Sequence, residues 1–275
     1  MKRWDRGWRL ALRFGLALLV ALFFLFPIYW LAAISVKTPE EIFAVPPVWV
    51  PSEIEFNSYE ILFRDGDVSS IWNSLVIAAI STLFAMVFGT IAAYSIVRFR
   101  TGGENLHMWI ISQRMIPPIA IAFPVFLLFV AWNLVDTMFG LIALYTAFNL
   151  SYVIWMMRGY LLEVPIDLEH SALVDGCSRW QVLLMVVLPM MRGALFATAV
   201  FAFVFAWNEF LFALVLTGSE TITYPVRVTG YFGSQSTFWQ KIGAMSMLGV
   251  IPMMFIVGTM QRFMVRGMSL GAVKG

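Results

Sequence analysis

The sequence has 275 residues, of which 61% are hydrophobic and 12% are charged, whereas soluble domains average about 45–50% and 25%. This much apolar surface exceeds what one soluble core can bury, which excludes an ordinary water-soluble globular protein. The net charge of +2 is too small and too scattered for a nucleic-acid partner, and the single Cys177 excludes an internal disulfide and a multi-cysteine metal site.

Apolar stretches that can cross a membrane, which takes about 20 residues each, recur six times along the chain. The fifth stretch contains Asn208 and Glu209 but is otherwise apolar, and it is long enough to insert. The first stretch follows a basic segment, as a signal peptide would, but its apolar run is longer than the roughly 7–15 residues of a signal core. The sequence therefore predicts an all-α, multi-pass membrane protein with helices at about 10–34, 71–97, 111–135, 138–158, 193–217 and 241–262.

The distribution of Lys and Arg predicts how these helices are oriented, because positively charged segments stay in the cytoplasm. Thirteen Lys and Arg residues fall on the side of the N-terminus and four on the other side, with Arg114 assigned to neither. We therefore expect both termini to be cytoplasmic. The loop 158–192 and the tail 263–275 are then cytoplasmic, whereas the loops 36–70 and 218–240 are periplasmic.

The cytoplasmic loop 158–192 has the pattern of two short helices joined by a sharp turn. Pro165 suits the start of the first helix, and Gly176 after Asp175 can take the left-handed conformation that ends it. Ser178 and Gln181 have the spacing of a capping box for the second helix. Periodicity alone leaves open an amphipathic segment that lies on the lipid surface.

The run Glu169-His170-Ser171-Ala172-Leu173-Val174-Asp175-Gly176-Cys177, followed by Leu188-Pro189, resembles the EAA loop of binding-protein-dependent ABC importer permeases. In that family the first short helix docks in a cleft of the ATPase subunit. The resemblance implies that the ATPase couples through Glu169, His170, Ser171, Ala172, Asp175, Gly176 and Trp180. His170 replaces the usual second Glu and Ser171 the first Ala, so Glu169 is the candidate for an acidic contact to the ATPase.

Other stretches are similar to the smaller permease of maltose-type carbohydrate importers. They include Asn73-Ser74, Asp136-Thr137, Trp207-Asn208-Glu209-Phe210 and the tail that ends at Gly275. The resemblance implies a type I ABC importer permease in the bacterial inner membrane, with a second homologous permease, two ATPase subunits and a periplasmic solute-binding protein as partners. It also implies that Gly271, Lys274 and Gly275 of the tail contact the ATPase subunits.

The sequence gives only candidates for the residues that line the substrate path. A carboxylate inside a membrane span needs a polar partner or water, so Glu209 with Asn208 is a candidate for the path, and Asn149 and Tyr152 are candidates on the preceding span. The alternative for each is a structural hydrogen bond between helices. By the resemblance, Tyr231, Gly233, Ser234 and Gln235 are candidates for contact with the binding protein, the alternative being an interfacial aromatic belt.

We therefore predict a permease subunit of an ATP-driven importer for a small hydrophilic solute, a sugar or a related polyol or glycoside. The sequence contains no GxxxxGK[ST] phosphate-binding loop, so we expect no cofactor or metal on this chain, with ATP and Mg²⁺ on the partner ATPase. An ion-coupled secondary transporter would show internal repeats, and a membrane-embedded enzyme would show converging ionisable groups. Neither internal repeats nor converging ionisable groups are apparent. An ion-coupled secondary transporter remains the alternative function.

Overall fold

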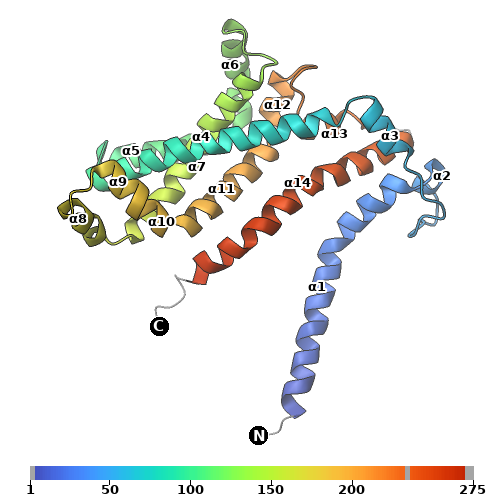
Figure 1. The fold of residues 1–275 in the computed structure, drawn as a ribbon. Coiled ribbons are helices and arrows are strands. Elements are labelled where there is room, and N and C mark those ends of the chain that lie inside the picture. The colour runs from blue at the N-terminus through green and yellow to red at the C-terminus, as the bar shows by residue number, and fades with distance from the viewer. Residues whose placement is uncertain (1–3, 233–235, 270–275) are drawn as a thin grey trace. The chain divides into compact units, whose positions relative to one another are not determined.

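The computed structural model describes residues 4–232 and 236–269, and every regular element within these ranges is a helix (Figure 1). Single helices that are long and apolar enough to cross a membrane cover Leu12–Val36, Ser69–Phe99, Met138–Glu163 and Phe238–Thr259. Two bent pairs of helices meet the same criteria, which gives up to six spans if each pair counts once. The predicted all-α membrane fold is thus confirmed.

The chain forms two compact units. The first comprises residues 1–68 and 228–251. It contains α1 (Trp4–Val36), α2 (Pro39–Ile42), α3 (Asn57–Arg64) and the first part of α14 (Ser236–Ser269). Gly243 allows α14 to approach α1 closely, because a Cβ at this position would lie 2.9 Å from the amide nitrogen of Ser35 and 3.0 Å from the carbonyl oxygen of Leu31.

The second unit comprises residues 69–227 and 252–275. Its central helices are α4 (Ser69–Phe99), α7 (Met138–Glu163) and α11 (Arg192–Trp207), which pack side by side (Figure 1). Gly89 of α4 faces the fully buried Val153 of α7. The remaining elements are α5 (Gly103–Ser112), η1 (Gln113–Met115), α6 (Pro118–Ala131), α8 (Ile166–Val174), α9 (Arg179–Val182), η2 (Leu183–Val187), α10 (Leu188–Met190), α12 (Leu211–Leu216) and α13 (Tyr224–Thr229), which continues into the first unit.

The third apolar stretch, expected as one helix at 111–135, is broken. The helical pair Asn105–Met115 and Pro118–Ala131 is bent by 94°. Proline disfavours helical geometry at the residue before it and has no amide hydrogen, and Ile116 accordingly has an extended backbone just before Pro117 and Pro118. The fifth stretch, expected at 193–217, is divided as well, because α11 ends at Trp207 and α12 begins at Leu211.

The loop that connects α6 to α7 forms hydrogen bonds with the segment that follows α12. Asp136 adopts a positive φ of 55°, and its carboxylate accepts hydrogen bonds from the amides of Glu220 (3.2 Å) and Thr221 (2.9 Å) and from the Thr221 hydroxyl (2.6 Å). Burial disfavours the charged carboxylate, but these hydrogen bonds outweigh burial and hold the pKa of Asp136 below its usual value.

Candidate functional site

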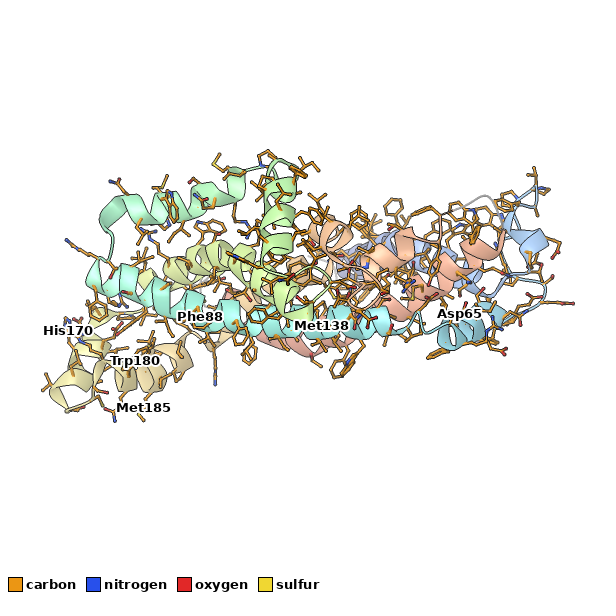
Figure 2. All side chains as sticks on the ribbon, turned by 90° about the horizontal axis from the view of Figure 1, so that it is seen from above. Asp65, Phe88, Met138, His170, Trp180 and Met185 are labelled. Carbon is orange, nitrogen blue, oxygen red and sulfur yellow. The ribbon has the colours of Figure 1, made fainter. Side chains whose placement is uncertain are left out.

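The segment between α7 and α11 forms the expected helix, turn and helix. Pro165 is the N-cap of α8, and Gly176 turns the chain with a φ of +90°, which favours glycine. The Ser178 hydroxyl accepts from the Gln181 amide, and the Gln181 side chain accepts from the Ser178 amide, so the predicted capping box is confirmed. Figure 2 shows His170, Trp180 and Met185 of this segment together at one end of the helices.

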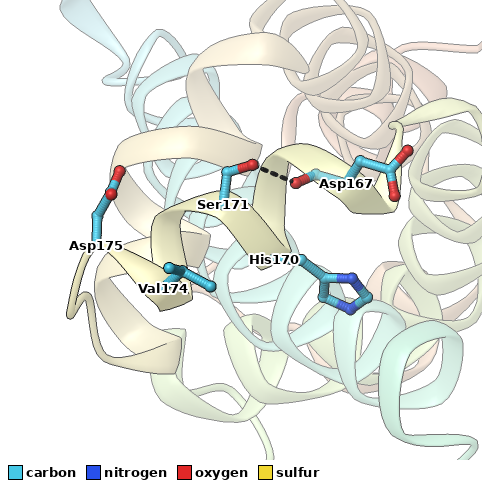
Figure 3. A pocket seen from close by; sticks show the side chains of 5 residues that line it. All are labelled: Asp167, His170, Ser171, Val174 and Asp175. Carbon is cyan, nitrogen blue, oxygen red and sulfur yellow. Dashed lines mark hydrogen bonds between the residues drawn. The ribbon is translucent and has the colours of Figure 1, made fainter.

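One side of α8 faces away from the rest of the unit and is slightly hollowed. We call it the docking face, and it is formed by Asp167, His170, Ser171, Val174 and Asp175 (Figure 3). The Ser171 hydroxyl donates to the Asp167 carbonyl oxygen at 2.9 Å, and Val174 is 87% exposed. Two carboxylates, an imidazole, a hydroxyl and an exposed valine therefore share this face. Such a surface suits a partner with basic groups and an apolar contact.

The opposite side of α8 faces the interior of the unit. Ala172 and Leu173 pack against the buried core that includes Val182 and Leu183. Glu169 is only 2% exposed, and its carboxylate lies 2.6 Å from Nε of Arg98 and accepts from the Tyr94 hydroxyl at 2.9 Å.

The structure therefore separates the residues implied by the EAA resemblance. His170, Ser171 and Asp175 lie together on the docking face, whereas Glu169 and Ala172 lie on the inner side of the same helix. Glu169 does not supply an exposed acidic group, because both of its oxygens are used within the chain. Asp167 and Asp175 are the exposed carboxylates of the docking face. Sequence reasoning missed Asp167, although its spacing of three and four residues from His170 and Ser171 places all three on one face. Trp180 is exposed on α9.

The two candidates on α7 have different surroundings. Asn149 is buried, and its side-chain amide donates to the Ala202 carbonyl oxygen of α11 at 3.2 Å, which joins the two helices. The Tyr152 ring lies edge-on to Phe205 of α11, with the ring centroids 5.1 Å apart. The guanidinium of Arg114 lies 5.3 Å from the Tyr152 ring and 5.1 Å from the Phe205 ring.

Asn208 and Glu209 lie at the break between α11 and α12 and are not equivalent. One oxygen of Glu209 accepts from the Phe212 amide at 2.9 Å, and the other accepts from the Ala213 amide at 3.1 Å and the Tyr145 hydroxyl at 2.7 Å. These bonds satisfy the first amides of α12 and tie it to α7. Asn208 is exposed, and its side-chain amide donates to the Val204 carbonyl oxygen at 2.8 Å.

The remaining candidates are described only in part. Tyr231 is buried in the first unit, where its hydroxyl donates to the carboxylate of Asp67 and Lys241 lies over its ring. Gly233, Ser234, Gln235, Gly271, Lys274 and Gly275 lie outside the described residues. Among the described side chains, no group of three or more His, Cys, Asp or Glu residues could hold a metal ion.

A bundle of apolar helices of membrane-spanning length with a short exposed helix at one end defines the class of the protein as a multi-pass α-helical membrane protein. The model of the family described as the inner membrane component of binding-protein-dependent transport systems matches residues 85–270. The chain belongs to this family of transport permeases, which confirms the family predicted from the EAA loop.

Individual relatives match almost the whole chain. It is 34% identical to the trehalose transport system permease protein SugB of Mycobacterium tuberculosis, over 94% of this chain and 95% of that protein. It is 31% identical to the sulfoquinovosyl glycerol transport system permease protein SmoH of Agrobacterium fabrum, over 96% and 94% of the two chains. A chain of a bacterial ABC transporter involved in alginate import has the same fold, with a TM-score of 0.77 at 23% identity over 95% of this chain and 98% of that chain.

Proposed function

We propose that this chain is the permease subunit of an ATP-driven importer that carries a sugar or a related polyol or glycoside across the inner membrane. Relatives named for trehalose and for sulfoquinovosyl glycerol transport support the substrate class. Family membership gives no support to an ion-coupled secondary transporter. In this proposal the chain performs no bond chemistry, and ATP and Mg²⁺ act on the partner ATPase.

The proposed assembly contains a second homologous permease, two ATPase subunits and a periplasmic solute-binding protein. Both termini and the loop 158–192 are cytoplasmic in this assembly, as the distribution of Lys and Arg predicts. One ATPase subunit binds the docking face of α8, and closure of the ATPase dimer moves α8 and switches the helices between two arrangements. The uncovered docking face is the observation that carries this proposal, because its two carboxylates, imidazole and exposed valine are left accessible to a partner.

The solute path in this proposal follows the side of α11 that carries Phe205 and Asn208, both of which are exposed. Their spacing of three residues places them on one face of the helix, and Arg114 lies over the Phe205 ring. An arginine within a membrane span requires a polar partner or water. Asn149 and Glu209, by contrast, hold helices together in this proposal, since their polar atoms bond to neighbouring elements.

The experiment that tests this function is recovery of partner subunits on an affinity tag attached to this chain, with Val174→Arg as the variant. Val174 makes few contacts in the chain, so the change leaves the fold intact. The long cationic side chain would fill the face, pair with Asp175 and repel the basic groups expected on the partner, so we expect recovery of the ATPase to fall by about tenfold or more.

Val45→Arg is the matched control, because Val45 is 94% exposed and lies in the loop predicted to be periplasmic. This variant should recover as much ATPase as the wild type. Equal recovery with Val174→Arg and Val45→Arg would show that α8 is not the docking site. A wild-type chain that is recovered alone and still transports sugar would refute the ATP-driven importer.

A further inference from the structure

Three elements meet at the Arg98 side chain, in the last turn of α4. Its Nε lies 2.6 Å from a carboxylate oxygen of Glu169 on α8, and its Nη2 donates to the carbonyl oxygen of Val164, the C-cap of α7, at 3.0 Å. Tyr94, one turn before Arg98 on α4, donates its hydroxyl to the other oxygen of Glu169. Glu169 is therefore held by two side chains of the same face of α4.

This contact differs in kind from the others that hold α8. Ala172 and Leu173 pack against the core through apolar surfaces, whose attraction depends on the area in contact and not on the direction of individual bonds. The bonds from Arg98 and Tyr94 fix both oxygens of one carboxylate, so they fix the rotation of α8 about its axis and its position along α4. Glu169 is 2% exposed and Arg98 is 9% exposed, so water does not replace these bonds easily.

Tyr94 connects this contact to the core of the helix bundle. Tyr94 belongs to the buried core that also contains Val153 and Met157 of α7 and Ala202 of α11. Five residues before Tyr94, Gly89 brings the backbone of α4 against Val153. A displacement of α4 at Arg98 would therefore act on close-packed contacts with α7 and α11.

We propose that Glu169, Arg98 and Tyr94 are positioning residues that transmit the movement of α8 to α4, and through α4 to the helices that line the solute path. The inference rests on the proposed function, since it assumes that an ATPase binds the docking face. It assigns Glu169 a different task from its neighbour His170: His170 contacts the ATPase, and Glu169 carries the resulting displacement inward.

A buried ion pair could also serve only to stabilise the fold, so the test must separate stability from transmission. The double variant Glu169→Met/Arg98→Met removes both charges and replaces them with flexible apolar side chains. Such replacements are often neutral or stabilising, whereas removal of one partner leaves a buried charge without a counter-ion. The double variant therefore keeps α8 packed against α4 but removes the directional bonds.

The measurement is amide hydrogen exchange of the complete complex in lipid nanodiscs, without nucleotide and after trapping with MgATP and vanadate, which needs no knowledge of the solute. In the wild type we expect trapping to change exchange both in α8 and at the last turns of α4, around Tyr94 and Arg98. In the double variant we expect the change in α8 to remain and the change in α4 to be lost. Tyr94→Phe, which removes one of the two bonds, should give an intermediate loss.

The control removes an ion pair elsewhere, Lys241 with Asp65 at 3.7 Å, by Lys241→Met/Asp65→Asn, and should retain both changes. A change in α4 that persists in the double variant would overturn the proposal. So would failure of both the double variant and Tyr94→Phe to assemble with the ATPase, because the contact would then be needed for folding alone. If the wild-type chain recovers no ATPase, the proposed function fails before the variants are compared.

Discussion

The close approach of α4 to α7 at Gly89 leads to a quantitative prediction for Gly89→Ala. A Cβ at Gly89 would lie 2.6 Å from Cγ1 and 2.9 Å from Cβ of Val153, whereas carbon atoms in contact prefer about 3.5–4.0 Å. The helices would have to separate by about 1 Å, and overpacking of this kind costs about 1–3 kcal/mol. Alanine recovers up to about 1 kcal/mol through its better helix propensity. We therefore expect a net destabilisation of up to about 2 kcal/mol.

The assay is thermal unfolding in detergent, followed by the reaction of Cys177, the single cysteine, with a thiol-reactive fluorophore. Cys177 is partly buried against the core, so its reactivity reports loss of packing. Each kcal/mol corresponds to about 2–4 °C in Tm for a chain of this size. Gly159→Ala on α7 is the control, because nothing lies within 4 Å of the added Cβ, and it should leave Tm unchanged or raise it.

A second substitution tests the cause of the loss. Val153→Ala removes Cγ1 but keeps Cβ, which lies 2.9 Å from the added carbon, so Gly89→Ala should cost less in that background by about 0.5–1 kcal/mol and should still be destabilising. Strictly additive effects of the two substitutions, or a Tm for Gly89→Ala equal to that of Gly159→Ala, would refute the steric argument.

The remaining predictions concern two carboxylates. Asp136→Ala should destabilise the protein by about 2–4 kcal/mol at neutral pH, because it removes three hydrogen bonds to a charged acceptor. The pKa of Asp136 is lowered in the folded state, so its contribution is complete above the unfolded value of about 3.9 and is lost as the pH falls through the folded pKa. The Tm values of wild type and variant should converge below about pH 4, and a constant difference would contradict this. Glu209→Gln should lower stability by about 1.5–3 kcal/mol, because the new NH₂ group faces donors, whereas Tyr145→Phe should cost about 1 kcal/mol in the same thermal assay. Loss of transport without loss of stability in Glu209→Gln would instead assign Glu209 to the solute path.

The local sequence pattern was enough to predict the helix, turn and helix in the loop at residues 158–192. The turn at Gly176 and the capping box of Ser178 and Gln181 depend on residues within four positions of each other, so their chemistry can be seen in the sequence. The acidic docking face was only partly predictable. Asp167 lies at helical spacing from His170, but which side of α8 is covered depends on α4, which is distant along the chain.

By itself, the sequence determined that the protein is an all-α membrane permease, because hydrophobic stretches of spanning length and the EAA run are local properties. Only the tertiary structure decided the roles of the individual polar residues. Glu169 resembles a docking residue in the sequence, yet it is turned inward because Arg98 and Tyr94, 71 and 75 positions away, offer it a buried ion pair and a hydrogen bond. Glu209 likewise satisfies the first amides of α12 once the helix breaks before Leu211. A buried carboxylate needs partners, and the fold, not the neighbouring sequence, supplies them.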